Sequence, residues 1–322
     1  MERTAAFVSI GRKPEQAFER VRQVEDLGYD SVWCNHLMGF DAMITAAAYA
    51  GITSKIGIGT GVLPILPRHP ATMAQEAASV DAMSGGRFSL GIGVSHRVTM
   101  EDMLGLDLSH PAPQMREYLT VVTSILRTGA TSFSGDYYNV NFSFMGLDRV
   151  REDQPVLIAA LAPRMLEVAG ELADGVVLWL AAPHYIEHTV VPIVSEARAR
   201  VGKSMEGFDI VAAVPSAVTD DVEAGREALR AFLVTYCSLP FYRKMLESSG
   251  FGPDLERFDA EGQGGISNEM LDALGGIGDA AAVQAAVKRY RDAGATLPGV
   301  GPLQKHAGYA GAEATFKAAA GG

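Results

Sequence analysis

The stretch Asp81-Ala82-Met83-Ser84-Gly85-Gly86-Arg87-Phe88-Ser89-Leu90-Gly91-Ile92-Gly93 passes from the end of one predicted element into the next. Apolar spacing predicts a helix over 71–83, and the two glycines end it because glycine accepts a left-handed conformation. A short apolar run then predicts a strand over 88–94. This passage from helix through glycine to strand is half of a parallel βαβ unit.

The same order of elements repeats along the whole chain. Apolar or β-branched runs predict strands over 5–10, 31–36, 56–63, 88–94, 156–160, 176–180, 210–214 and 295–300. Strands that alternate with helices imply parallel pairing, and eight such units favour a closed (β/α)8 TIM barrel of the α/β class over an open doubly wound sheet. Because no linker or change of composition divides the chain, we expect one domain over 1–322.

Glycines mark the predicted ends of the helices between these strands. An apolar stripe over 17–27 ends at Gly28, and a helix over 42–50 ends at Gly51. The last regular helix is predicted over 283–290.

Two segments are too long for the plain repeat, and we interpret them as insertions. Residues 99–154 contain a predicted helix over 115–126 and a predicted hairpin over 131–140. Residues 239–278 are rich in glycine, and we expect them to be mobile. In a barrel, insertions that follow strands lie on the C-terminal face, which is the catalytic face.

Composition argues against several classes of function. The 322 residues carry a net charge of −11, and no Lys/Arg cluster forms the basic face of a nucleic-acid binder. No segment is apolar over the roughly 18 residues that a membrane span needs. The first residues lack the pattern of a secretory signal, and Cys34 and Cys237 form no disulfide framework. We therefore expect a cytoplasmic protein that binds neither nucleic acid nor membranes.

One motif points to a metal but is interpreted otherwise. The run His184-Tyr185-Ile186-Glu187-His188 fits the H-x-x-E-H pattern of some zinc peptidases. No third ligand is identifiable, and patterns of five residues often match by accident. We expect a solvated helix start here and no metal site.

Four stretches, taken together and in order, resemble the luciferase-like superfamily. They are 27–36, 58–64 with Arg68-His69-Pro70, 81–93, and 155–160 with 163–166 and 173–176. The resemblance implies a barrel that holds a flavin-type ring over the carboxyl ends of its strands. The chain length fits the branch that uses the deazaflavin coenzyme F420, such as the methylene-tetrahydromethanopterin reductases.

This resemblance also implies an activity and an assembly. We expect hydride transfer between coenzyme F420 and a small organic substrate, in a homodimer. The alternatives are an FMN-dependent monooxygenase and a non-catalytic barrel that binds a flavin.

His36 is the candidate catalytic residue, because it ends the second predicted strand, where a barrel places catalytic groups. An imidazole exchanges a proton near neutral pH, whereas the alternative is a strand-end histidine bonded to a backbone carbonyl. In similar F420 enzymes this position lies beside the coenzyme ring, which implies that His36 orients the coenzyme or moves the balancing proton. Asn35 resembles the neighbour that binds the coenzyme, and its alternative interpretation is a turn residue.

Thr60, Gly61 and Val62 belong to the coenzyme site according to the resemblance. In the family, the position of Gly61-Val62 carries a cis peptide bond that forms a bulge behind the ring. The alternative interpretation is a simple strand bulge at glycine.

Gly93, Val94 and His96 follow the fourth predicted strand and are assigned to the same site. Two glycines separated by one residue let the backbone approach a ligand, although the dinucleotide fingerprint is incomplete. His96 is either a second acid/base group or a polar wall residue. Some relatives that oxidise sugar phosphates hold a carboxylate there, so His96 argues against that substrate class.

Ala160, Leu161 and Ala162 lead from the fifth predicted strand into a helix that begins at Pro163. Free N–H groups and the helix dipole favour an anion at such a start, and in the family this turn helps to hold the coenzyme phosphate. Many relatives have glycines at positions 161 and 162, and the alternative is a plain helix start. Trp179 ends the sixth strand and either lines the pocket or belongs to the core.

Overall fold

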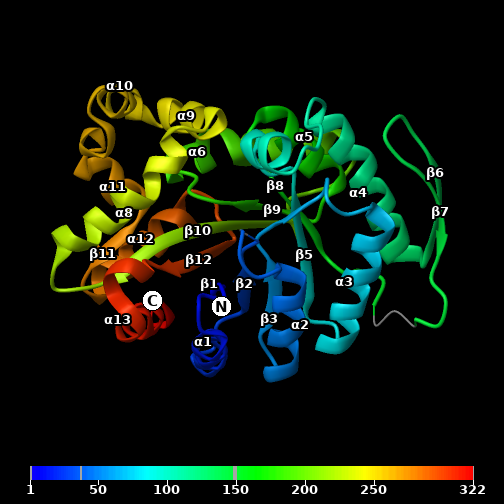
Figure 1. Cartoon of the computed structure of the whole chain (residues 1–322), viewed down its shortest axis with the longest axis horizontal. Helices are drawn as coiled ribbons and strands as arrows, with labels where there is room; N and C mark the ends of the chain where they lie inside the picture. Colours follow the sequence, from blue (N-terminus) through cyan, green and yellow to red (C-terminus); the bar gives the residue numbers. More distant parts are fainter. Residues whose placement is uncertain (1, 37, 148–150, 322) are drawn as a thin grey trace.

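Eight parallel strands close into a barrel in the computed structural model (Figure 1), which describes residues 2–36, 38–147 and 151–321. In barrel order the strands are β1 (Ala5–Phe7), β2 (Ser31–Cys34), β3 (Gly57–Thr60), β5 (Phe88–Gly93), β8 (Val156–Ala159), β9 (Gly175–Leu178), β10 (Asp209–Val218) and β12 (Leu297–Pro302). Every neighbouring pair is parallel, and β12 pairs with β1 to close the ring. The predicted (β/α)8 TIM barrel and its eight strands are confirmed.

Helices follow the strands and cover the outside of the barrel (Figure 1). They are α1 (Pro14–Asp26), α2 (Ala42–Ile52), α3 (Pro70–Ser84), α4 (Pro111–Thr128), α5 (Pro163–Leu172), α6 (Pro183–Tyr185), which continues through the π-helical turn η2 (Ile186–Val190) into α7 (Val191–Arg200), α8 (Val222–Cys237), α12 (Ala280–Asp292) and α13 (Gln304–Ala320). Among the described residues, no helix has the length and apolar character needed to cross a membrane.

The predicted helix ends are partly confirmed. Gly28 follows α1 with a φ of +80°, a conformation that glycine adopts without strain. The prediction for Gly51 is wrong, because α2 continues through it and ends where the backbone of Thr53 becomes extended. The helix predicted over 283–290 is confirmed as α12, but it is not the last helix, since α13 follows the final barrel strand.

The first insertion contains the predicted helix and hairpin. After η1 (Val98–Met103) come α4 and the antiparallel strands β6 (Ala130–Ser134) and β7 (Asn139–Ser143). The Glu117 carboxylate of α4 accepts hydrogen bonds from the backbone N–H groups of residues 136–138, at 2.8, 2.9 and 3.0 Å, and so ties the turn to the helix. Residues 148–150 of the predicted insertion lie outside the described residues.

The second insertion is folded into short helices, which corrects the expectation of a mobile segment. Its elements are α9 (Pro240–Leu246), η3 (Glu247–Phe251), α10 (Gly252–Glu261), η4 (Gly262–Gly265), α11 (Asn268–Leu274) and the short strand β11 (Gly276–Gly278). Arg230 of α8 donates from Nε to the Ile266 carbonyl at 2.9 Å, and Asp254 accepts the Ser267 N–H at 2.8 Å. These buried polar contacts order a sequence that composition alone marks as irregular.

Side chains fill the barrel interior. The inner core consists of Ala5, Phe7, Trp33, Leu157, Val177, Val211, Ala213 and Leu297. Glycines make room for the two rings, because a Cβ at Gly59 would lie 2.4 Å from Trp33 and one at Gly299 would lie 2.5 Å from Phe7. Val62 and Trp179, which follow the carboxyl ends of β3 and β9, pack on this core and are only partly buried. They form the apolar floor of the barrel mouth.

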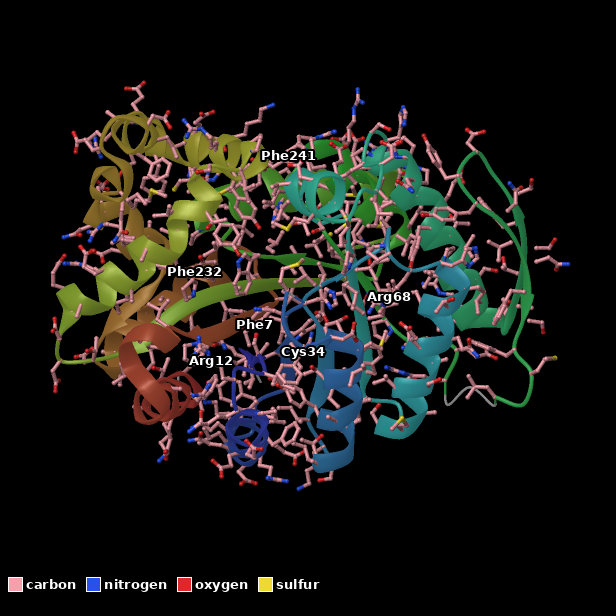
Figure 2. All side chains as sticks on the ribbon, viewed as in Figure 1. Phe7, Arg12, Cys34, Arg68, Phe232 and Phe241 are labelled. Carbon is pink, nitrogen blue, oxygen red and sulfur yellow. The ribbon has the colours of Figure 1, made fainter. Side chains whose placement is uncertain are left out.

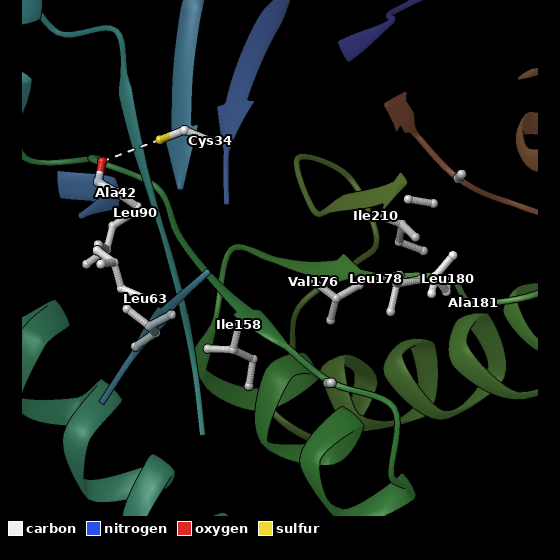
Figure 3. Packing of buried hydrophobic residues seen from close by; sticks show 14 of the residues in the cluster. Cys34, Ala42, Leu63, Leu90, Ile158, Val176, Leu178, Leu180, Ala181 and Ile210 are labelled. Atoms are coloured by element: carbon white, nitrogen blue, oxygen red, sulfur yellow. Dashed lines mark hydrogen bonds between the residues drawn. The ribbon is translucent and has the colours of Figure 1, made fainter. Parts of the chain in front are cut away.

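A larger core lies between the strands and the helices (Figure 3). Its buried aliphatic side chains include Leu63, Leu90, Ile158, Val176 and Ile210. Strands of a parallel barrel are covered on both faces, which explains their nearly continuous apolar runs.

The stretch over 81–93 is held in place by a buried carboxylate. Asp81 is 2% exposed and accepts the Phe88 N–H at 3.0 Å. Arg151 donates to both of its oxygens, at 2.9 and 3.1 Å. A buried charge is tolerated only with such partners, so these contacts fix how α3 leads into β5.

The contact between β3 and β5 leaves no room for a side chain at Gly91, because a Cβ there would lie 1.8 Å from the Thr60 carbonyl oxygen. We expect Gly91→Ala to lower the free energy of unfolding by about 3 kcal/mol or more. Gly51→Ala is the matched control. It should raise stability by about 0.5–1 kcal/mol, since nothing lies within 4 Å of the added methyl in α2. Urea unfolding measures both, and equal stabilities would contradict this packing.

Candidate active site

Residues at or just after the carboxyl ends of β1, β2, β3 and β5 meet at the mouth of the barrel. A Cβ on Gly61 would lie 3.0 Å from the Phe7 ring and 3.5 Å from Asn35 Oδ1. A Cβ on Gly93 would lie 2.8 Å from Val62. Asn35, Gly61, Val62 and Gly93 are therefore neighbours in space, although the sequence separates them by up to 58 positions from Asn35 to Gly93.

The backbone between β3 and β4 (Leu63–Pro64) carries the bulge that the resemblance implied. The Gly61-Val62 peptide bond is cis. From Gly59 to Leu63 the chain advances four residues, while its partner advances three, from Ser89 to Ile92. One extra residue is a β-bulge.

Thr60 lies within the wall of the barrel rather than at its surface. It is fully buried, and its hydroxyl donates to the Gly91 carbonyl and accepts the Gly91 N–H, both at 2.9 Å. The donor and the acceptor of this hydroxyl are therefore both occupied by β5. The side chain of Thr60 therefore supports the site without being available to a ligand.

His36 follows β2 and uses one ring nitrogen for a local contact. Its Nδ1 accepts the backbone N–H of Ala42, at the start of α2, at 3.2 Å. A nitrogen that accepts carries no hydrogen, so neutral His36 carries its hydrogen on Nε2. Within the described part of the chain, Nε2 has no hydrogen-bond partner.

Two charged residues surround this imidazole. Asp41 Oδ2 lies 3.7 Å from His36 Nδ1 and forms an ion pair with Arg68. Burial lowers the pKa of His36, the nearby Asp41 raises it and Arg68 lowers it again, so that the pKa lies below its ordinary value. His36 is therefore neutral at pH 7. His69 caps α3 by accepting the Ala71 N–H at 3.3 Å.

Asn35 presents a buried oxygen without a partner. Its Oδ1 is shielded from solvent, and no donor of the described chain reaches it. An amide oxygen in such a place is expected to accept a hydrogen bond, because leaving it unpaired costs about 1–3 kcal/mol. It is suited to accept an N–H from a bound ligand.

Aromatic side chains of α8 and α9 lie beside Trp179 at the mouth, and no pattern in the sequence marks them as site residues. Trp179 packs edge-on against Phe7 with ring centres 5.5 Å apart, and its Nε1–H donates to the Tyr236 hydroxyl at 2.8 Å. The Tyr236 and Tyr242 rings are 4.9 Å apart, and Tyr242 lies 5.9 Å from the His96 ring. In Figure 2, Phe7 and Cys34 lie near the middle of the view, with Arg68 to the right and Phe232 and Phe241 to the left and above.

His96 and Val94 continue beyond β5, where Ser95 has a positive φ of 63°. Such a conformation is uncommon outside glycine and often marks a functional loop. Burial lowers the pKa of His96. Its ring faces Tyr242, which places it in the wall toward α9.

The turn over 160–162 joins β8 to α5. Ala160 is buried, and the Leu161 carbonyl accepts from the Tyr185 hydroxyl at 2.6 Å. Ala162 is the N-cap of α5 and supplies no side-chain cap. The predicted helix start at Pro163 is thus confirmed, and the binding of an anion there stays a prediction.

The zinc-peptidase pattern is arranged differently from a metal site. The rings of His184 and His188 stack with centres 4.2 Å apart, and His188 Nδ1 lies 3.0 Å from the His184 carbonyl. Over the described ranges, no three or more His, Cys, Asp or Glu side chains are grouped as metal ligands.

Comparison with known proteins adds family relationships to this geometry. The family model described as luciferase-like monooxygenase matches residues 2–297. The chain is 27% identical over 314 residues to the 5,10-methylenetetrahydromethanopterin reductase of Methanopyrus kandleri, covering 90% of this chain and 89% of the relative. It is 28% identical over 241 residues to a putative coenzyme F420-dependent oxidoreductase of Mycobacterium tuberculosis, covering 69% and 68%.

Solved structures share the fold. The coenzyme F420-dependent tetrahydromethanopterin reductase from Methanopyrus kandleri has a TM-score of 0.85 at 23% identity, covering 99% of this chain and 97% of that one. An F420-dependent secondary alcohol dehydrogenase, in complex with an F420-acetone adduct, has a TM-score of 0.81 at 20% identity, covering 99% of each chain.

The two histidines of the mouth predict how stability depends on pH. Burial lowers the pKa of both His36 and His96 in the folded chain, whereas the unfolded chain takes up these protons near pH 6.5. Above about pH 6.5 neither group affects folding. As the pH falls below that value, the unfolded chain gains protons first and stability declines.

We expect His96→Asn to reduce this decline between about pH 7.5 and about pH 5.5, measured by urea unfolding. Carboxylates titrate mainly below this range. His110→Asn, at an exposed position, is the control for loss of a histidine. An unchanged decline in His96→Asn would contradict the assignment.

Proposed function

This chain belongs to the luciferase-like monooxygenase family, and on that premise we propose that it is an oxidoreductase that transfers a hydride between coenzyme F420 and a small organic substrate. The proposal is supported by relatives whose names specify F420 or the methylenetetrahydromethanopterin reductase activity, at 27–28% identity. The coenzyme, when bound, supplies a ring carbon that gives or accepts a hydride. The protein has to hold the ring, orient the substrate and exclude water.

The residues at the mouth fit a planar ring with a polar edge. Val62 and Trp179 offer an apolar surface above the inner core. Asn35 Oδ1, beside Gly61, is buried without a donor from the described chain and can accept an N–H from the ring edge. This unpartnered oxygen next to an apolar floor is the observation that carries the proposal.

Other residues have roles that follow from their contacts. His36 offers Nε2–H, because its Nδ1 is occupied by the Ala42 N–H. An oxygen atom of the substrate can accept that hydrogen bond. The open start of α5 after Ala162 is suited to the coenzyme phosphate, through its backbone N–H groups and the helix dipole.

The aromatic cluster from α8 and α9 covers the part of the mouth beside Trp179 and His96. Burial raises the pKa of the Tyr236 phenol, so its hydroxyl stays protonated over the physiological range. Trp179 donates to that hydroxyl oxygen, which leaves the phenol hydrogen to be directed elsewhere. These rings exclude water from the site, and this exclusion strengthens hydrogen bonds to a bound substrate.

The homodimer is proposed to form through the outer faces of α2 and α3. Ile44 and Met83 are 72% and 64% exposed, and α2 contains no charged residue. The carboxylates of α3, Glu76 and Asp81, are paired with Arg68 and Arg151. An exposed face with apolar side chains and paired charges fits a second copy of the same face.

Titration of the purified protein with F420 and, in parallel, with FMN tests the proposed coenzyme. Quenching of the two tryptophans, Trp33 and Trp179, follows binding. We expect F420 to bind and Asn35→Leu to weaken it about tenfold, the loss of one hydrogen bond worth roughly 1.4 kcal/mol. Asn141→Leu, on the exposed hairpin, is the matched control. Binding of FMN alone would move the chain to the monooxygenase branch, and binding of neither would remove the proposed chemistry.

Sedimentation tests the proposed dimer. The wild-type protein should sediment at twice the 34.2 kDa of one chain, and Ile44→Glu should sediment as the single chain because a buried unpaired carboxylate is costly. Val201→Glu makes the same change at another exposed apolar position, 47% exposed, and should remain a dimer. A wild-type monomer would contradict the proposal.

A further inference from the structure

We propose that Asp41 and Arg68 form a positioning pair that holds His36 with its hydrogen on Nε2, so that His36 donates a hydrogen bond to the substrate and keeps its proton. The identity of the acceptor rests on the proposed function. The state of the ring rests only on contacts within this chain.

The first contact is at the start of α2. Asp41 caps this helix, and its Oδ1 accepts the N–H groups of Met43 and Ile44 at 2.9 and 3.0 Å. The cap fixes the first turn and directs the preceding N–H, that of Ala42, to His36 Nδ1 at 3.2 Å. A donor aimed at Nδ1 and a hydrogen on Nδ1 exclude each other.

The second contact prevents Asp41 from reversing this arrangement. Its Oδ2 lies 3.7 Å from His36 Nδ1, where a free carboxylate would favour a protonated imidazole. That oxygen is instead paired with Arg68. The Arg68 side chain is only 17% exposed, so the pair is little screened by water.

Besides its ion pair with Asp41, Arg68 has two further contacts. Its Nε lies 3.3 Å from Glu76 Oε2, and its carbonyl accepts from the Tyr118 hydroxyl at 3.0 Å. Asp41 and Arg68 are the charged groups that face His36, with Glu76 behind Arg68. The Arg68-His69-Pro70 motif thus gains a role that its sequence did not reveal.

The chemical consequence is a donor that polarises an oxygen atom without being consumed. A neutral imidazole whose Nδ1 is occupied can stabilise negative charge on a substrate oxygen through Nε2–H. No bond to hydrogen breaks at His36, so the proton that balances the hydride passes between the substrate oxygen and solvent water when the site is open. This differs from a proton carrier, which would have to alternate between the neutral and charged forms.

Nitrogen-15 NMR of the histidine rings tests the inference on the protein without coenzyme or substrate. His36→Ala identifies the signal of His36. In the wild type at neutral pH, we expect Nε2 of His36 to carry the hydrogen and Nδ1 to carry none. Arg68→Met should shift the His36 titration to higher pH, because Asp41 is released toward the ring.

Asp41→Asn keeps the helix cap and removes the charge, and it should shift the titration to lower pH. Arg97→Met is the matched control, because it removes an arginine that follows β5 and pairs with Glu101. It should leave the titration of His36 unchanged. Opposite shifts in the two variants support the pair. A hydrogen on Nδ1 in the wild type, or shifts of the same sign in both folded variants, would overturn it.

If Arg68→Met fails to fold, two measurements still test the proposal. They are the position of the hydrogen on His36 in the wild type and the titration of His36 in Asp41→Asn. Because these measurements need no ligand, they are independent of the F420 titration. A protein that binds no F420 but shows the expected ring state would overturn the proposed function and leave the positioning pair standing.

Discussion

The close approach of β3 and β5 is the constraint on which the barrel mouth depends. Thr60 and Gly91 exchange two hydrogen bonds across the strands, at a separation that admits only glycine. Immediately beyond this contact the β3 side carries one extra residue, which places Val62 on the inner core and Gly61 against Asn35. A looser contact would let the bulge relax, and the apolar floor and the amide oxygen would no longer adjoin.

Burial and charge act together on the polar side of this floor. Burial alone lowers the pKa of an imidazole, and the positive Arg68 acts in the same direction while Asp41 opposes it. The same Asp41 side chain also caps α2, so it has a structural role besides its effect on His36. Pairing it with Arg68 retains the cap and limits its effect on the ring.

The sequence predicts the barrel because its strands are buried on both faces and appear as apolar runs between helices. It fails where tertiary contacts decide the local structure. The glycine-rich segment 239–278 is ordered by Arg230 and Asp254, and no periodic pattern reveals those contacts. His36 and Asn35 are predictable from their place after a strand, whereas Arg68 meets Asp41 only through the fold. Tyr236 was missed because an aromatic residue on a helix is ordinarily a core residue.

The two sides of the mouth come from different parts of the chain, and this division bears on specificity. Strand ends and the bulge provide the floor and position Asn35 and His36, and the close backbone contact of β3 and β5 cannot change without disturbing the barrel. The aromatic side comes from α8 and α9, which contact the barrel through Trp179, His96 and the hydrogen bond from the Ala182 N–H to Met245 Sδ at 3.4 Å. Substitutions in α8 and α9 alter the shape of the site above the floor and leave the floor itself intact. On the proposed function, we therefore expect the barrel mouth to select the coenzyme and the side chains of α8 and α9 to select the substrate.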